Sequence, residues 1–189
     1  MRRVVIPVLM MIGLLFCGCG EGEKLEKGLE QARVNWAEAE SVTITADVTA
    51  ELTESSFSCN LLCTRSGEET MVEVLSPENI AGIKARLSED AAEIEYDGLI
   101  LAVGDPGKGE ISPLKALPML MDALLTGHVR SIWAETEETG QLAAAEIFIS
   151  ETEYARIWFD RENFAPLHAE LVSDGRAVVK CEIKSFTEE

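Results

Sequence analysis

The stretch ISPLKALPMLMDALLTG, residues 111–127, decides how the rest of the chain folds. Ser112 can cap a helix, Pro113 suits the first helical turn, and Gly127 can end the helix. On a helical wheel, apolar side chains form one face and both of its flanks: Leu114, Leu117, Met121, Leu124 and Leu125 on the face, with Ala116, Leu120 and Ala123 beside it. Because so wide an apolar surface cannot face water, we expect the remaining chain to supply a concave apolar partner.

This helix has two interpretations that the sequence leaves open. Interrupted by Lys115, Pro118 and Asp122, it is too short to span a bilayer. Pro118 lacks an N–H group, so we expect a kink or a restart of the helix there. The helix is either an ordinary core helix or a movable plug over a ligand cavity. In the second case the ligand-facing or lid residues are Leu114, Leu117, Leu120, Met121, Leu124 and Leu125.

Strand patterns flank the helix on both sides. Apolar and polar residues alternate through residues 42–53, which predicts a long strand with one apolar face. Further strands are predicted at residues 57–65, 70–76, 80–87, 92–96 and 99–103, and after the helix at 129–137, 142–150, 154–160, 164–172 and 176–187. Turn signals such as Asp97-Gly98 separate them, and the connections are too short for parallel crossovers. About eleven antiparallel strands are therefore expected to curl around the helix.

Residues 24–38 carry apolar side chains at helical spacing, which predicts an amphipathic helix packed on the main body: Leu25, Leu29, Ala32 and Trp36. A chain of 189 residues with 47% hydrophobic residues suits one domain with a full core. The net charge of −18 disfavours a nucleic-acid partner, because phosphates would be repelled. We interpret this charge first as a solvated surface.

The N-terminus has the pattern of a targeting segment. Arg2 and Arg3 precede an apolar run, residues 4–16, and the sequence FCGC follows at residues 16–19. This run resembles the lipobox of bacterial lipoproteins, with Gly18 before the acylated Cys19. We therefore expect a signal peptide at residues 1–18, a lipidated cysteine and tether at 19–23, and one domain at 24–189. A plain cleaved signal peptide and an uncleaved anchor are the alternatives. Lipidation would attach the chain to the outer face of the cytoplasmic membrane.

Three cysteines are left after such processing. On a regular strand, Cys59 and Cys63 would share one face about 13 Å apart, beyond the reach of a disulfide. Cys181 alternates with apolar residues and also points inward. Buried reduced cysteines are the favoured interpretation, and a bridge from Cys181 to either of the others stays open.

The order of these features resembles the bacterial lipoprotein-carrier superfamily with the LolA/LolB-like fold. The matching features run from residue 25 to residue 186: an N-terminal helix, Ser76-Pro77 closing a strand, Tyr96-Asp97-Gly98 starting a hairpin, Ser112-Pro113 opening the inserted helix, and YARIWFD (154–160), PLHAEL (166–171) and Asp174-Gly175 in closing hairpins that look like those of its Gram-positive members. The resemblance implies a mainly β (α+β) fold: an antiparallel incomplete half-barrel of about eleven strands, with an N-terminal helix and an inserted apolar helix covering the concave face.

The resemblance also carries functional expectations. In carriers the cavity accepts acyl chains, and an arginine near the opening strands holds the lid, for which Arg65 is the nearest candidate here. Related lipid-anchored members of spore-forming bacteria serve as partners of cell-wall enzymes during germination, and this chain resembles that branch. The soluble carriers are not lipidated, whereas this chain has a lipobox, so an anchored protein fits better than a shuttle.

The sequence holds none of the common catalytic or phosphate-binding motifs, and we predict neither an enzyme nor a cofactor or metal site. The Cys59 and Cys63 pair alone lacks the four ligands of a zinc site, and His128 and His168 are assigned structural or solvent-facing roles. Two functions follow. The first is a membrane-anchored lipoprotein that binds an acyl chain, a lipid or a lipoprotein. The second is an adaptor that binds and regulates a cell-envelope enzyme.

Overall fold

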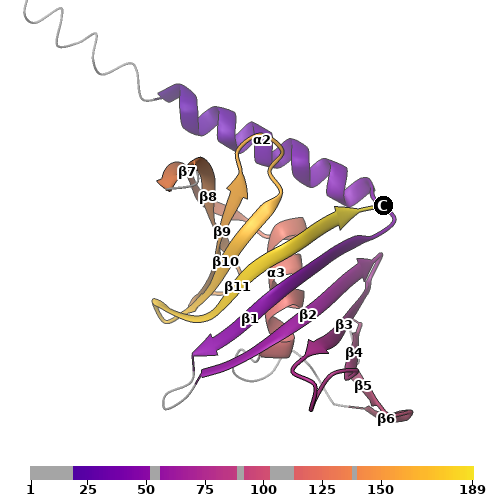
Figure 1. The fold of residues 1–189 in the computed structure, drawn as a ribbon. Helices are drawn as coiled ribbons and strands as arrows, with labels where there is room; N and C mark the ends of the chain where they lie inside the picture. Colours follow the sequence, from indigo (N-terminus) through magenta and orange to yellow (C-terminus); the bar gives the residue numbers. More distant parts are fainter. Residues whose placement is uncertain (1–18, 52–55, 89–91, 103–112, 138–139) are drawn as a thin grey trace, which may run out of the picture.

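The structure is a computed structural model that describes residues 19–51, 56–88, 92–102, 113–137 and 140–189 (Figure 1). Two helices and eleven strands follow in the order α2 (Cys19–Glu38), β1 (Val42–Glu51), β2 (Ser56–Ser66), β3 (Glu69–Ser76), β4 (Lys84–Leu87), β5 (Ala92–Tyr96), β6 (Leu99–Ala102), α3 (Pro113–Thr126), β7 (Val129–Glu137), β8 (Gly140–Phe148), β9 (Glu153–Asp160), β10 (Pro166–Ser173) and β11 (Arg176–Glu188). The predicted signal peptide and the predicted cap at Ser112 lie outside the described residues.

All eleven strands form one antiparallel sheet in the order β6-β5-β4-β3-β2-β1-β11-β10-β9-β8-β7. Each half of the chain is a meander, and the two meanders join where β1 pairs with β11. The helix α3 connects β6 to β7, the two edge strands, so it crosses the open side of the curved sheet (Figure 1). This arrangement confirms the predicted fold class of a mainly β, incomplete barrel with an inserted helix.

Strand β1 shows why the sheet has one apolar face. Its alternate residues from Val42 to Ala50 are all 2% exposed or less, whereas Thr43, Thr45 and Thr49 between them face outward. The same alternation in β2, β3 and the closing strands gives a concave side lined by the main core and a polar convex side. The alternation of apolar and polar residues along each strand therefore places the core on the concave side of the sheet.

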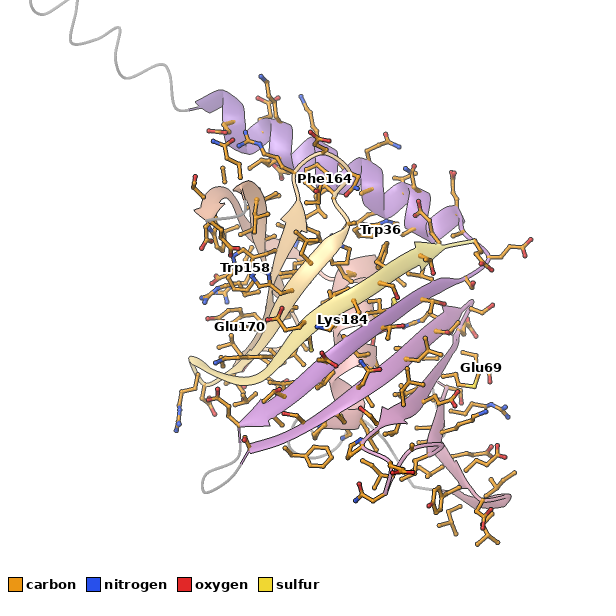
Figure 2. The ribbon with its side chains drawn as sticks, viewed as in Figure 1. Trp36, Glu69, Trp158, Phe164, Glu170 and Lys184 are labelled. Carbon is orange, nitrogen blue, oxygen red and sulfur yellow. The ribbon has the colours of Figure 1, made fainter. Side chains whose placement is uncertain are left out.

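The helix α2 crosses one end of the sheet and packs its four predicted apolar side chains into the core (Figure 1). It begins at Cys19, so residues 20–23, expected as a tether, are helical. Ion pairs hold this first turn in place: Glu23 pairs with Lys27, and Glu21 pairs with Arg161 of the β9–β10 turn. Further along, Gly28 lies against the ring of Phe164, whose labelled side chain is seen beside α2 in Figure 2.

Two predicted strands begin later than expected. The strand predicted at residues 80–87 starts only at Lys84, because the backbone before it forms a turn in which Ile80 N donates to Pro77 O. The strand predicted at 164–172 starts at Pro166, because Phe164 adopts a positive φ of 58° within the preceding turn. In both cases a turn with its own backbone hydrogen bonds precedes the strand.

The predicted Asp97-Gly98 hairpin is confirmed. Both residues have positive φ, 50° and 77°, which is the conformation of a type I′ turn between tightly paired strands. The helix α3 continues without a restart through Pro118, which is itself buried. Among the described residues, no helix has the length and apolar character needed to cross a membrane.

Candidate functional site

The candidate site is the concave face of the sheet together with α3. Leu117, Leu120, Met121 and Leu124 of α3 are 0% exposed and belong to the main core. Leu114 and Leu125 are half-buried and pack at the margin of the same core. The structure therefore brings all six predicted lid residues together in or against one core, and their role as a lid or plug stays a prediction.

The plug is shared between the two halves of the sheet. Its residues contact β1, β2 and β3 from the first meander and β8, β10 and β11 from the second (Figure 1). Neither meander alone closes around the helix, so removing α3 would open a continuous apolar trough across both. A trough of this kind is a surface on which a linear apolar molecule could replace the helix.

The carboxyl end of α3 is anchored by an arginine of α2. Arg33 Nη1 donates to Gly127 O and Arg33 Nη2 donates to Ala123 O, both at 2.8 Å. The last carbonyls of a helix lack partners within the helix, and a cation at this end is favoured by the helix dipole. Burial lowers the pKa of Arg33 from its ordinary value, and its buried Nε has no hydrogen-bond partner. This arginine therefore holds α3 at a cost in desolvation.

A second arginine holds the exposed side of the helix. Arg65 of β2 forms an ion pair with Asp122 of α3. The Asp122 side chain is 59% exposed, so solvent screens the pair, and pairs of this kind contribute about 0.2–1 kcal/mol. The structure thus places the predicted candidate Arg65 against α3, and its lid-holding role stays a prediction. Sequence reasoning missed Arg33, although its place four residues after Leu29, beside the apolar stripe of α2, was a usable signal.

The exit of α3 leaves no room for a side chain. A Cβ at Gly127 would lie 2.5 Å from Ile147 Cγ2 and 2.7 Å from Ala123 O. The N–H of Gly127 donates to both Asp122 O and Ala123 O at 3.1 Å. Beside this exit lies an open cavity of about 340 Å³, lined by Met119, Asp122, Ala123, Thr126, Gly127, His128, Phe148 and Ile149. Glycine therefore fixes the carboxyl end of the plug close to β8.

The concave face extends beyond α3 to the free edge of the sheet. On this side Tyr96 is opposite Leu99 and Ile94 is opposite Leu101 in the β5–β6 hairpin. Tyr96, Leu99 and Leu101 are 48%, 71% and 66% exposed. We call these three residues the apolar rim. The rim is an uncovered continuation of the surface that α3 covers elsewhere.

The three inward cysteines are free and buried, as the favoured interpretation predicted. Cys59 and Cys181 both pair with Val48, from opposite sides, so they lie two strand spacings apart, roughly 10 Å, beyond the reach of a disulfide. Burial raises the pKa of Cys59 to about 11 and those of Cys63 and Cys181 to about 12. These thiols act as small apolar core groups.

The convex face carries an aromatic cluster that sequence reasoning missed. Trp133 Nε1 and Trp158 Nε1 donate to the same oxygen of Glu135, at 3.1 and 3.0 Å. The ring of His168 stacks on Trp158 with centroids 4.4 Å apart, and its Nε2 lies 3.6 Å from Glu137 Oε1. The alternation of Trp133, Glu135 and Glu137 along one strand was the available signal. In the described part of the chain, no group of three acidic, histidine or cysteine side chains is arranged to hold a metal ion.

Comparison with solved structures identifies the fold. The chain matches the LolA superfamily protein NE2245 from Nitrosomonas europaea with a TM-score of 0.51 and 11% identity, covering 87% of this chain and 93% of that one. A DUF1329 family protein from Desulfovibrio piger matches with a TM-score of 0.52 and 9% identity over the same shares of the two chains. At such identities the likeness establishes the fold alone. The predicted LolA-like fold is thus confirmed.

A third match is a complex that contains a lipoprotein. The structure of the CwlD amidase from Clostridioides difficile in complex with the GerS lipoprotein matches with a TM-score of 0.44 and 12% identity, over 87% of this chain and 95% of that one. A likeness of this strength does not decide branch or partner, so the germination-lipoprotein branch stays a prediction. No protein-family profile matches the chain, and no curated protein matches it by sequence.

Proposed function

We propose that this chain is a lipid-anchored extracytoplasmic protein that binds an acyl chain or similar hydrophobic ligand on the concave face of its half-barrel, without catalysis. One observation carries the proposal. The apolar face of α3 fills the trough between the two meanders, while the half-buried Arg33 holds its carboxyl end and a solvent-exposed ion pair with Arg65 holds its polar side. Such a helix can exchange with a ligand of the same apolar character.

The exchange requires α3 to leave part of its contact surface. The ion pair of Arg65 with Asp122 is the weaker contact, so it acts as the latch, and Arg33 acts as the anchor at the helix end. The apolar rim supports the proposal, because it offers a ligand an exposed apolar entry next to the covered trough. Acyl chains would then bury the leucine and methionine side chains that α3 buries in the closed state.

Ligand binding is tested by native mass spectrometry of the full chain extracted from membranes in detergent, with a fluorescent fatty-acid titration beside it. The proposal expects a co-purifying lipid and saturable binding. Asp122→Asn breaks the latch without changing the trough, so we expect affinity to rise by up to about fivefold. Asp47→Asn is the matched control, because Asp47 pairs with Lys184 on the convex face. The absence of both a co-purifying lipid and saturable fatty-acid binding would contradict the proposal.

The proposed lipid attachment to the membrane is tested separately. We propose that Cys19, the first residue of α2, carries the diacylglyceryl group and that residues 1–18 are removed. Labelling cells with a palmitate analogue should mark the wild-type chain and not Cys19→Ala. Labelling that persists in Cys19→Ala would show that another residue is lipidated. Labelling that fails in the wild-type chain would show that the chain is not lipidated. Two or more acyl chains are expected to give stable attachment.

A second candidate function is that of an adaptor for a cell-envelope protein, such as a cell-wall or germination enzyme. The observation that favours it is the free edge strand β6, in which Leu99, Ile100 and Leu101 are 71%, 63% and 66% exposed. Exposed apolar edges of sheets are sites at which another chain can pair. Crosslinked pull-downs from cells that recover no stable partner would count against this function.

A further inference from the structure

The two edges of the sheet differ in how well they are protected from pairing with another chain. The edge strand β7 packs against α2 and carries the charged residues Arg130, Glu135 and Glu137. The other edge, β6, has the sequence LILA, without charge, proline or a bulge, and its three large side chains are more than 60% exposed. Natural sheets blunt free edges by such devices, and among the described residues β6 is protected by its shortness, four residues. The edge is therefore suited to pairing.

The hairpin geometry shows which backbone groups are free. In a two-residue hairpin the residues that flank the turn form a hydrogen-bonded pair, and such pairs alternate along the ladder. Tyr96 and Leu99 flank the Asp97-Gly98 turn, so Leu99 and Leu101 direct their backbone groups toward β5. Ile100 and Ala102 consequently direct their N–H and C=O groups toward the open edge.

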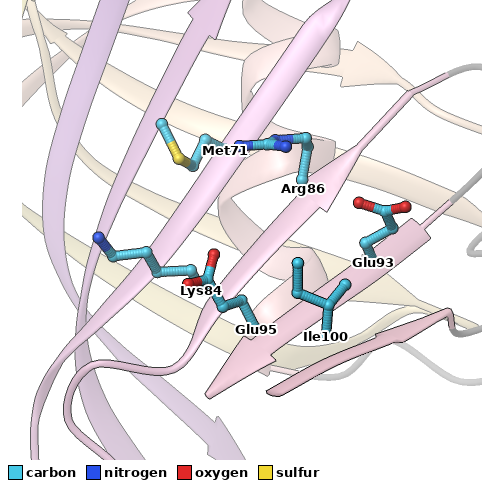
Figure 3. Close-up of a pocket in the computed structure, with 6 residues that line it drawn as sticks. All are labelled: Met71, Lys84, Arg86, Glu93, Glu95 and Ile100. Carbon is cyan, nitrogen blue, oxygen red and sulfur yellow. The ribbon is translucent and has the colours of Figure 1, made fainter. Parts of the chain in front are cut away.

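The convex face beside this edge selects the charge of a partner. A cavity of about 130 Å³ lies there, and Figure 3 shows the side chains that line it: Met71, Lys84, Arg86, Glu93, Glu95 and Ile100. Each cation forms an ion pair with an acid of β3 and is opposite an acid of β5 in the strand register. Arg86 Nε is 2.7 Å from Glu69 Oε1 and Arg86 is opposite Glu93, while Lys84 Nζ is 3.8 Å from Glu73 Oε2 and Lys84 is opposite Glu95. Four carboxylates and two cations thus lie on the convex side of three neighbouring strands.

The two carboxylates nearest the edge are only partly neutralised. Glu93 is opposite Ala102 and Glu95 is opposite Ile100, so neither has a cationic neighbour in β6. A strand added to β6 would place its convex-side residues two strand spacings from these acids, within reach of long basic side chains across the small Ala102. Its concave-side residues would contact Leu99 and Leu101. A second copy of this chain would bring the same acids and a net charge of −18 to the interface.

We propose that β6 is a docking edge for an extended segment of a partner protein in which apolar residues alternate with lysine or arginine. The segment adds a twelfth strand, antiparallel or parallel, with its apolar side toward the apolar rim and its basic side toward Glu93 and Glu95. This inference rests on the adaptor function and is independent of ligand binding under α3. It assigns the partner by charge and period rather than by identity.

The test uses synthetic eight-residue peptides in which valine alternates with lysine, with glutamate in place of lysine, or with the lysine sequence scrambled. Binding to the full chain in phosphatidylcholine nanodiscs is measured by fluorescence anisotropy. The alternating basic peptide should bind at least about tenfold tighter than the other two, and Glu93→Gln with Glu95→Gln should weaken it several-fold and flatten its salt dependence. Glu182→Gln, on the convex side of β11, is the charge control.

Two variants separate edge pairing from general attraction of a basic peptide to an acidic protein. Ile100→Pro removes the outward N–H without removing a bond to β5, and proline is tolerated at such edge positions. It should weaken basic-peptide binding about tenfold, whereas Ile100→Ala, which keeps the N–H, should weaken it by about threefold or less. Equal effects of the two variants, or equal binding of the scrambled peptide, would overturn the proposal.

The remaining outcomes are also decisive. Dimers in sedimentation that Ile100→Pro abolishes would show that the occupant is a second copy and overturn the assignment. Fatty-acid binding should be unchanged in Ile100→Pro. If peptide binding fails while fatty-acid binding persists, only the docking edge is wrong; if fatty-acid binding fails while peptide binding persists, only the ligand proposal is wrong.

Discussion

The sharpest consequence of the anchored helix concerns Arg33→Met. Methionine keeps the apolar length of the side chain but removes both hydrogen bonds to Gly127 O and Ala123 O. Hydrogen bonds from charged donors contribute about 1.5–3 kcal/mol each. The carbonyls of a released helix end regain water, and the arginine is half-buried with an unpartnered Nε, so we halve the sum. The loss in the stability of the closed helix is then about 2 kcal/mol.

Hydrogen exchange measures this loss where it occurs. A change of about 2 kcal/mol raises the open population of α3 about 30-fold, so its amides should exchange about 30-fold faster. Amides of β1 and β11, at the centre of the sheet, should change much less if α3 opens as a separate unit. Lys24→Met, an exposed change in α2, is the control and should alter neither.

The same experiment can refute the reasoning. Equal acceleration of exchange in α3, β1 and β11 would mean that α3 opens only when the whole domain unfolds. The helix would then be an ordinary core element and not a lid. Arg33→Lys adds a graded point, because lysine retains the charge but not the forked pair of donors, and an intermediate acceleration is expected.

Three other changes test the packing. Gly28→Ala places a Cβ 2.3 Å from the Phe164 ring and should cost about 1–3 kcal/mol in thermal unfolding, whereas Gly22→Ala in the same helix meets open space and should stabilise. Leu120→Ala empties a fully buried site and should cost about 2–5 kcal/mol in urea unfolding; a cost well below 1 kcal/mol would contradict close packing. The folded state raises the pKa of Cys63 from 9.0 to about 12, so the folded chain binds more protons in that window, and its stability should fall as pH rises above 9. Cys63→Ala should reduce that slope in urea titrations.

Sequence reasoning located the elements well where a single face is buried. The alternation in residues 42–53 predicted β1, since a one-residue slip would turn every apolar side chain to water. The wide apolar surface of α3 predicted a concave apolar partner, and the curved sheet is that partner. Boundaries failed where turns compete with strands, as at Gly82 and Phe164, because the positive φ of those residues follows from tertiary contacts and local hydrogen bonds.

The site was predicted in part. All six lid residues lie in or against one core, because burial follows directly from the apolar face of the helix. The contact of Arg33 with α3 joins residues more than ninety positions apart, and no local pattern contains it. On the convex side, Glu93 and Glu95 of β5 are opposite the two cations of β4. This arrangement also depends on the register of the strands, which the sequence alone did not determine.

The most direct test of the central claim is to map where a bound acyl chain lies. A fatty acid with a photoreactive group near its terminal methyl is bound to the full chain and irradiated, and the crosslinked peptides are sequenced by mass spectrometry. Crosslinks are expected to the inward side of α3, around Leu117 and Met121, and to facing residues of β2 and β3 such as Leu61 and Val72. Saturable binding with crosslinks confined to the apolar rim, or no crosslink to the concave face at all, would contradict the central claim.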